Sequence, residues 1–254
     1  MAWVAAGSII VSDWHRNPES REYFSKILNK KKRKLFGLLE APVMPPHLKA
    51  DIVRYKVFLS GKSGVGKTTL ASRLAGLDMP NIHYETAVFW PVKLKESGRM
   101  FFFCFQLWDC GENATRRFDH MLPSCKEHVD AILFLFSFTD RGSFEDLSTQ
   151  MSRVIEPPDR LVRLVVGTKY PLIKTDMKAH LSDHFFYVTE SDITCFREAW
   201  GVPVFRIGGD VSGGLGEIAP LLNALAENLW HQNYMHASTS VSYYPGHDGA
   251  EIMV

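Results

Sequence analysis

The chain has 254 residues, of which 46% are hydrophobic and 22% charged, and its formal net charge is +1. These values are typical of a soluble globular protein, and the small net charge gives no indication of a nucleic-acid partner. The apolar run at residues 131–138 is far too short to span a bilayer. The four cysteines show no C-x-x-C spacing, which argues against a zinc site or a disulfide framework and favours a reducing cytosol.

Residues 1–46 are predicted to form an N-terminal extension before the main domain. Residues 2–11 are apolar but lack a basic leader, so we expect a buried arm or a frayed strand rather than a secretory signal. Asn17, Pro18 and Glu19 are typical of a helix start, and apolar residues then recur at helical spacing until Pro42. A basic run inside this helix has two open interpretations, a solvated helix face or a weak contact with an anionic membrane or partner; it consists of Lys30, Lys31, Lys32, Arg33 and Lys34.

The most specific motif follows residues 55–60, an apolar segment that predicts a buried strand. The motif matches the phosphate-binding pattern G-x-x-x-x-G-K-[ST] without a mismatch, and it consists of Gly61, Lys62, Ser63, Gly64, Val65, Gly66, Lys67 and Thr68. Its glycines let successive N–H groups point at one anion, Lys67 would contact the β- and γ-phosphates, and Thr68 would ligate Mg²⁺. A helix is predicted from Thr69 onward, which places the phosphates at a helix N-terminus and makes Thr69 a further binding candidate.

The remaining segments predict strands that alternate with helices. Strands are expected at residues 87–94, 100–108, 131–136, 161–167 and 202–207, and a closing helix at residues 215–229. The first two of these strands are joined by a Ser-Gly turn and predict a hairpin. We therefore expect an α/β fold with a mostly parallel central sheet, an antiparallel hairpin edge and flanking helices, over residues 53–231. Residues 237–254 predict a disordered tail because they lack periodicity.

Three further residues are candidates to complete a magnesium and nucleotide site. Thr86 is predicted to lie in a polar loop, where its hydroxyl would reach Mg²⁺ and the γ-phosphate; the alternative is a threonine that only begins a strand. Asp109 follows a predicted strand, and its carboxylate would hold Mg²⁺ through water. Gly111 would offer its N–H to the γ-phosphate, and a plain Asp-x-Gly turn is the alternative. The predicted metal-binding residues are thus Thr68, Thr86 and Asp109.

At this point the chain resembles the Ras superfamily of small GTPases, and its Rab branch most. The resemblance covers about residues 53–231 and rests on four motifs, which are the phosphate loop with Ser63, W-D-C-G at 108–111, R-F-D-H-M-L-P-S at 117–124 and D-R-G-S-F at 140–144. The segments F-G-L-L-E at 36–40, F-W-P at 89–91, W-D-C-G-E at 108–112 and L-F-S-F-T-D-R at 135–141 look more narrowly like Rem- and Rab-like small GTPases of the ciliogenesis and planar polarity effector complex.

This resemblance implies a P-loop small GTPase fold that binds GTP or GDP with Mg²⁺. It also implies protein partners resembling Inturned and Fuzzy, a cytoplasmic location at the cytoskeleton of the ciliary basal body, and a role in cilium biogenesis, exocytosis and targeted vesicle and protein transport. No cysteine follows Cys195, and Ala2 rather than glycine follows Met1. We therefore expect no lipid anchor, and recruitment through protein partners.

One departure from the family pattern concerns catalysis. Small GTPases usually carry Asp-x-x-Gly-Gln, whereas here the span is one residue shorter and Glu112 follows Gly111. A carboxylate beside a γ-phosphate would repel it and orient the attacking water poorly. Glu112 stands at the catalytic position and is the candidate catalytic residue, but because a carboxylate is poorly suited to this role we expect slow hydrolysis.

A second departure concerns the base. The family's Asn-Lys-x-Asp motif should follow the fifth strand, where this chain has Thr168, Lys169, Tyr170 and Pro171. Lys169 can still stack on a base and Thr168 remains a binding candidate, but Pro171 offers no side-chain acceptor to guanine. Asp176 is a possible substitute on the longer loop at residues 171–187, and no Ser-Ala-Lys motif occurs around Ile207.

We predict a GTP-binding switch whose loops around Thr86 and Gly111 become ordered with GTP and Mg²⁺. The alternative is an adaptor that holds a nucleotide without cycling, with weak or no hydrolysis. A nucleoside or nucleotide kinase is disfavoured because the sequence has no arginine-rich lid.

Overall fold

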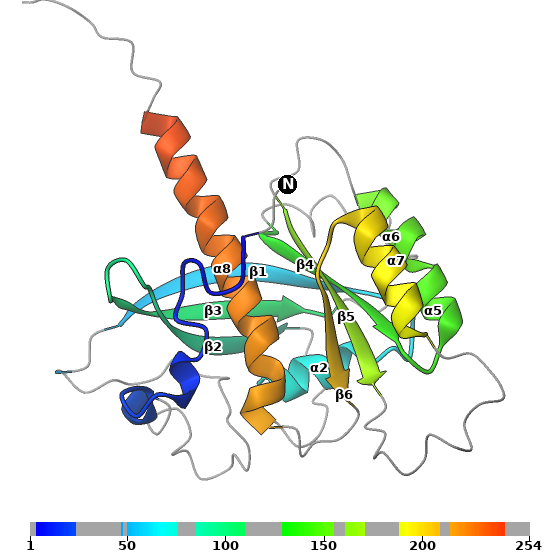
Figure 1. The fold of residues 1–254 in the computed structure, drawn as a ribbon, viewed down its shortest axis with the longest axis horizontal. Coiled ribbons are helices and arrows are strands. Elements are labelled where there is room, and N and C mark those ends of the chain that lie inside the picture. Colours follow the sequence, from blue (N-terminus) through cyan, green and yellow to red (C-terminus); the bar gives the residue numbers. More distant parts are fainter. Residues whose placement is uncertain are drawn as a thin grey trace, which may run out of the picture.

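The computed structural model describes residues 4–23, 47, 50–75, 85–109, 129–154, 161–170, 188–208 and 214–241 (Figure 1). The elements are, in chain order, η1 (Trp14–Arg16), β1 (Asp51–Ser60), α2 (Lys67–Leu74), β2 (Glu85–Lys93), β3 (Met100–Trp108), β4 (Ala131–Ser137), α5 (Arg141–Glu145), α6 (Leu147–Val154), β5 (Val162–Tyr170), α7 (Glu190–Trp200), β6 (Val204–Gly208) and α8 (Gly214–Val241). Residues 20–23 are also helical.

The strands form one six-stranded sheet with the order β2-β3-β1-β4-β5-β6. All neighbouring pairs are parallel except β2 and β3, which form the antiparallel hairpin. This arrangement confirms the predicted α/β fold with a mostly parallel sheet and an antiparallel edge. Because the parallel strands share one direction, their carboxyl ends meet at the same edge of the sheet, and the loops that follow them can share one site.

Helices cover both faces of the sheet, and β4 shows why. Its alternate residues Ala131, Leu133 and Leu135 pack into a core with α2 and α8, whereas Ile132, Phe134 and Phe136 pack into a second core with α6 and α7. All seven residues of β4 are buried, as the continuous apolar run predicts for a central parallel strand. Figure 1 shows α5, α6 and α7 gathered on the β4–β6 side, while α8 crosses the sheet near β1 and β3.

The N-terminal arm, residues 4–16, packs against the domain rather than standing apart from it. Ile10 forms an antiparallel bridge with Leu94 at the end of β2, and Ile10 and Trp14 are both buried in the core of α2 and α8. The arm is thus held by two buried side chains and a strand-like bridge, while several of its other residues are exposed. The sequence pattern does not indicate η1, and most of the predicted basic helix, with Lys30 to Lys34, lies outside the described residues.

The helix α8 is longer than the sequence pattern predicted. It ends at Val241, so the first five residues of the predicted tail at 237–254 are helical. The apolar face that signalled the helix ends near Leu229, but residues 221–241 contain no glycine or proline, and nothing in them interrupts the backbone ladder. Among the helices of the described ranges, none has the length together with the apolar composition that a membrane span requires.

Gly167 in β5 provides a test of this packing. A Cβ at this position would lie 2.3 Å from Phe138 Cε2 and 2.6 Å from Phe136 Cζ. We expect Gly167→Ala to lower the free energy of unfolding by about 1–3 kcal/mol, measured by urea denaturation, because the rings must move off their preferred positions. Gly216→Ala is the control: its Cβ would meet Arg16 Nη2 at 3.9 Å in a helix, so stability should be unchanged or slightly higher. A Gly167→Ala protein as stable as the parent would contradict the described contact of β5 with the aromatic rings.

Candidate nucleotide-binding site

The phosphate-binding motif forms the connection between β1 and α2, as predicted. Gly61, Gly64 and Gly66 have φ angles of 155°, 80° and 97°, which side-chain-bearing residues rarely adopt. A Cβ on Gly61 would lie 2.6 Å from the Leu135 carbonyl oxygen of β4. The loop therefore passes directly against the neighbouring strand, and its backbone turns into α2 at Gly66, the N-cap of that helix.

Lys67 is the first residue of α2 and is only 8% exposed. Its Nζ donates hydrogen bonds to the carbonyl oxygens of Gly61, at 2.8 Å, and Lys62, at 2.9 Å. The loop thus folds around the ammonium group and fixes its position at the helix N-terminus. A fixed cation and the free N–H groups of a helix start are the features that bind a phosphate.

Thr68 and Asp109 meet beside this loop. Asp109 directly follows β3, and the parallel pairing of β1 with β3 brings the ends of the two strands together. The Thr68 hydroxyl donates a hydrogen bond to Asp109 Oδ2. A hydroxyl and a carboxylate are hard oxygen ligands of the kind that Mg²⁺ prefers, so these two residues fit the predicted metal role.

Thr86 does not lie in a polar loop, and that prediction was wrong. It is the second residue of β2, stands opposite Leu107 of β3, and is 8% exposed. The reason is that the antiparallel ladder extends to the pair Glu85 and Trp108, which includes Thr86 in the hairpin. The role of Thr86 as a metal ligand stays a prediction.

Several other sequence-predicted positions lie outside the described residues. They are Gly111 and Glu112 after β3, and Pro171 and Asp176 after β5. Their roles toward the γ-phosphate and the base stay predictions.

The end of β5 contacts the phosphate loop through two residues. The Thr168 hydroxyl, on a 6% exposed residue, donates to the carbonyl oxygen of Val65 and lies 3.0 Å from that of Phe136. Lys169 has a left-handed φ of 52°, and its Nζ donates to the Gly64 carbonyl oxygen at 3.0 Å. The structure thus brings both predicted residues to the loop from a strand about a hundred positions further along the chain. Stacking of Lys169 on a base stays a prediction.

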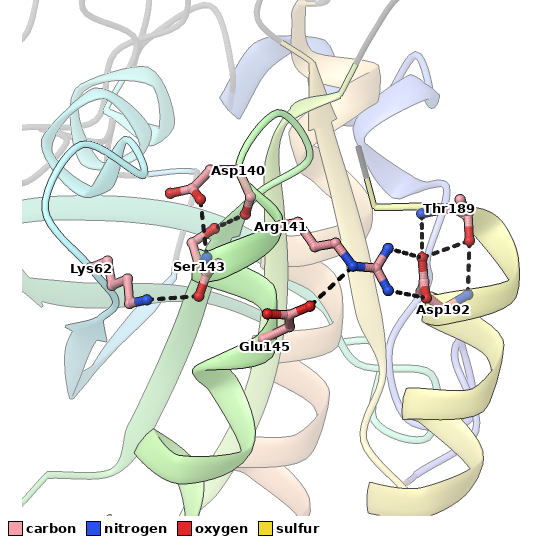
Figure 2. A network of polar contacts seen from close by, with 8 residues as sticks. Lys62, Asp140, Arg141, Ser143, Glu145, Thr189 and Asp192 are labelled. Carbon is pink, nitrogen blue, oxygen red and sulfur yellow. Dashed lines mark hydrogen bonds and ion pairs between the residues drawn. The ribbon is translucent and has the colours of Figure 1, made fainter. Parts of the chain in front are cut away.

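The loop is also joined to α5, a contact that the sequence pattern does not indicate (Figure 2). Lys62 Nζ donates to the Gly142 carbonyl oxygen at 2.7 Å. Asp140 is the N-cap of α5 and accepts from the Ser143 N–H at 3.3 Å, while the Ser143 hydroxyl donates to the Asp140 carbonyl at 2.6 Å. The motif D-R-G-S-F was recognised as a family feature, but nothing in its local pattern shows that a lysine 80 residues earlier contacts it.

The same network continues from α5 to α7. Arg141 donates two hydrogen bonds to the Asp192 carboxylate, both at 3.1 Å (Figure 2). Asp192 also forms the capping box of α7 with Thr189. Hydrogen bonds from the Thr189 hydroxyl and backbone, and then from Arg141, lower the pKa of Asp192 below its usual value. Asp192 is therefore a carboxylate at neutral pH and can hold both helices together.

Arg73 forms a comparable link in the last turn of α2. Its guanidinium donates to the Gly208 carbonyl oxygen at the end of β6 and to the Glu217 carboxylate in α8. The Gly208 N–H donates to the same carboxylate. Arg73 and Glu217 are largely buried, with 12% and 19% of their side chains exposed. These hydrogen bonds fix the C-terminal end of α2 against the end of β6. The family's Ser-Ala-Lys motif, which is absent from this sequence, would be expected at this end of β6.

Comparison with known proteins agrees with this geometry. Residues 56–190 match the model of the Ras family. The chain is 69% identical to ciliogenesis and planar polarity effector 2 of Danio rerio, over 95% of this chain and 94% of that protein. It is 46% identical to the protein of the same name from Homo sapiens, over 91% of this chain and 93% of that protein. It is 30% identical to GTP-binding protein REM 2 of Rattus norvegicus, over 48% of this chain and 36% of that protein. The phosphate loop, the sheet order and these matches together show that the chain belongs to the Ras family, whose domain implies a guanine nucleotide as the ligand of this site.

Proposed function

We propose that this protein is a GTP-binding molecular switch that requires Mg²⁺ and acts in cilium biogenesis. The observation that carries the proposal is the phosphate loop, in which Lys67 is held by two loop carbonyls while the Thr68 hydroxyl contacts Asp109. A site whose cation and oxygen ligands are already in place loses little conformational freedom when it binds a ligand. The Ras-family match supports a guanine nucleotide as that ligand.

Each residue of the loop has a defined part in this proposal. The N–H groups of residues 61–69 surround the phosphates, and Lys67 supplies the positive charge between the β- and γ-positions. Thr68 and Asp109 hold Mg²⁺, with Thr86 as a third proposed ligand, and the bound ion neutralises charge on the β- and γ-phosphates. Thr168 and Lys169 keep the loop in position through the carbonyls of Val65 and Gly64.

The proposed switch lies in the residues that would sense the γ-phosphate. Gly111 follows Asp109 by two positions and would donate its N–H to that phosphate. Binding of GTP would order this segment and create a surface for partners, and loss of the phosphate would release it. Hydrolysis would be slow because Glu112 occupies the place of a water-orienting amide.

The relatives support the cellular part of the proposal. Proteins named as ciliogenesis and planar polarity effectors match this chain over nearly its whole length. We infer that the chain works in the same kind of complex, with partners resembling Inturned and Fuzzy, at the basal body and in targeted vesicle and protein transport. The basic residues Lys30 to Lys34 would add a weak contact with an anionic membrane.

A non-cycling adaptor is the second candidate function. It is favoured by the altered base motif, because the Thr168 hydroxyl is engaged with the loop and Pro171 has no acceptor for guanine. Multiple-turnover release of phosphate separates the two candidates: a switch hydrolyses GTP repeatedly, whereas an adaptor retains its nucleotide.

Removing the loop lysine tests nucleotide binding directly. We expect Lys67→Ala to weaken the binding of a fluorescent GTP analogue by at least about 100-fold, because a charged contact with two phosphates is lost. Lys62→Ala is the matched control, because it removes the same charge from the same loop. The Lys62 amine, however, contacts the Gly142 carbonyl of α5 and not the carbonyls of the phosphate loop. The affinity of Lys62→Ala should change far less. Equal affinity of Lys67→Ala and the parent would rule out the proposed phosphate site.

Replacing Glu112 tests the predicted hydrolysis rate. We expect the parent to hydrolyse GTP at or below about 10⁻⁴ per second in single-turnover assays. Glu112→Gln should be neutral or faster, because an amide does not repel the γ-phosphate and can orient water. A large loss of activity in Glu112→Gln would instead identify Glu112 as a working base.

Recruitment in cells tests the switch. We expect Thr68→Asn, which removes a hydroxyl ligand of Mg²⁺, to disperse a fluorescently tagged protein from the basal body into the cytosol. Deletion of residues 242–254 leaves α8 intact to its end at Val241 and should not disperse it. Loss of localisation in the deletion together with normal localisation of Thr68→Asn would contradict nucleotide-gated recruitment.

A further inference from the structure

A groove of about 720 Å³ lies at the end of the sheet opposite to the phosphate loop. Its lining includes Ile9 from the arm, Lys95 and Arg99 from the β2–β3 turn, and Trp230 and Tyr234 from α8. Phe101, which also lines the groove, lies opposite Asp51 in the β1–β3 ladder, at the start of β1. The phosphate loop follows Ser60, at the other end of β1. Nine steps of a strand span about 30 Å, so the two sites are well separated.

The floor of the groove is aromatic. Phe101 and Trp230 pack with their ring centroids 4.9 Å apart, and the Arg99 guanidinium lies 5.2 Å from the Phe101 ring centroid. Tyr234 is 64% exposed, unusually so for a large apolar side chain. An exposed aromatic ring beside a packed apolar floor is characteristic of protein-binding surfaces.

The arm forms a fixed wall of the groove because a buried carboxylate of α8 holds it. Glu227 is 2% exposed and accepts hydrogen bonds from the N–H groups of Gly7 at 2.8 Å, Ile9 at 2.6 Å and Ile10 at 3.3 Å. The Ser8 hydroxyl donates to the same carboxylate at 3.4 Å. A buried charge with several donors is stable only while those donors stay in place. The arm is therefore anchored, and its residues Ser8 and Ile9 line a preformed surface.

The other two walls are also fixed. The Lys95 N–H donates to the Ile9 carbonyl oxygen at 2.9 Å, which joins the turn to the arm. Asn233 of α8 donates to the Tyr55 hydroxyl of β1 at 2.8 Å, and burial raises the pKa of Tyr55 to about 12, so the phenol stays neutral. A rigid groove binds a ligand without first being ordered.

The rim of the groove carries positive charge on the side of the turn. The Lys95 ammonium donates to the Gly7 carbonyl oxygen, a neutral partner, and it forms no ion pair with another described residue. Arg99 pairs with Asp51, but both side chains are more than 60% exposed, so solvent screens this pair. Glu96 is the acidic residue of the groove lining. An apolar floor beside these cations is complementary to an apolar side chain next to a carboxylate.

We propose that this groove binds a peptide segment of a partner protein that inserts a large apolar side chain between Phe101 and Tyr234 and places an adjacent carboxylate near Lys95. The surface is about 30 Å along β1 from the phosphate loop and is built from the arm, the turn and α8, so it binds its partner in both nucleotide states. It is thus a second interface, independent of the proposed switch.

Selection from a phage-displayed library of random 12-residue peptides on the full chain tests this proposal. The strongest peptides are then synthesised and their affinities measured by isothermal titration calorimetry. We expect them to share a large apolar residue next to Asp or Glu. Tyr234→Ala and Lys95→Gln should each weaken binding at least about 10-fold, because they remove the exposed ring and the charge that the complex desolvates. Glutamine keeps a donor for the Gly7 carbonyl, so the wall should remain.

Two matched variants complete the design. Ile52→Ala removes the other large exposed apolar side chain of the described residues, outside the groove, and should leave affinity unchanged. Lys67→Ala should also leave it unchanged, which separates this proposal from the nucleotide site. Failure to enrich apolar–acidic peptides, or affinities insensitive to both groove variants, would overturn the proposal. So would a tenfold gain in peptide affinity on deleting residues 242–254, which would identify the chain's own end as the occupant, or dimerisation that Tyr234→Ala abolishes.

Discussion

The close approach of Gly61 to the Leu135 carbonyl is the contact on which the site depends. It is possible because β1 and β4 are parallel neighbours and Gly61 has no side chain to hold them apart. The loop can then curl around Lys67 and deliver Thr68 to the end of β3. Any larger residue would lift the loop from the sheet and separate the Lys67 cation from the proposed metal ligands. The geometry of one glycine thus sets the chemistry of the whole loop.

Side chains from distant elements then hold the loop in place. Lys62 links it to α5, Thr168 and Lys169 link it to β5, and Arg73 links α2 to the end of β6. Many of these hydrogen bonds are accepted by backbone carbonyls. The position of the loop therefore depends on the path of the backbone and only weakly on which side chains stand at the accepting residues. Such a preorganised cradle can bind polyphosphate tightly, and in the proposed switch the response to the γ-phosphate would belong to the residues that follow β3.

The sheet also separates the two proposed binding surfaces. At the carboxyl ends of its parallel strands lies the phosphate loop, and at the other end Glu227 holds the N-terminal arm against α8 and the β2–β3 turn. Residues 4–23 therefore belong to the same core as the Ras-family domain, although the family motifs begin after them. An extension fixed in this way can shape a binding surface that a minimal domain would lack.

The sequence by itself determined the phosphate loop, the buried strand β4 and the hairpin edge, because glycine spacing, continuous apolar runs and turn residues act locally. It also pointed to Asp109, since residues that end parallel strands gather at one edge, whereas Thr168 and Lys169 were indicated by their resemblance to the family's base motif. Only the tertiary structure decided that Thr86 lies inside β2, that α8 continues to Val241, and that Glu227 receives the arm. The first and third outcomes depend on which segments pair across 20 to more than 200 residues. The second depends on how far the helix continues beyond the residues that pack against the sheet. Local patterns carry no record of such pairings, because the partner is set by the folded chain as a whole.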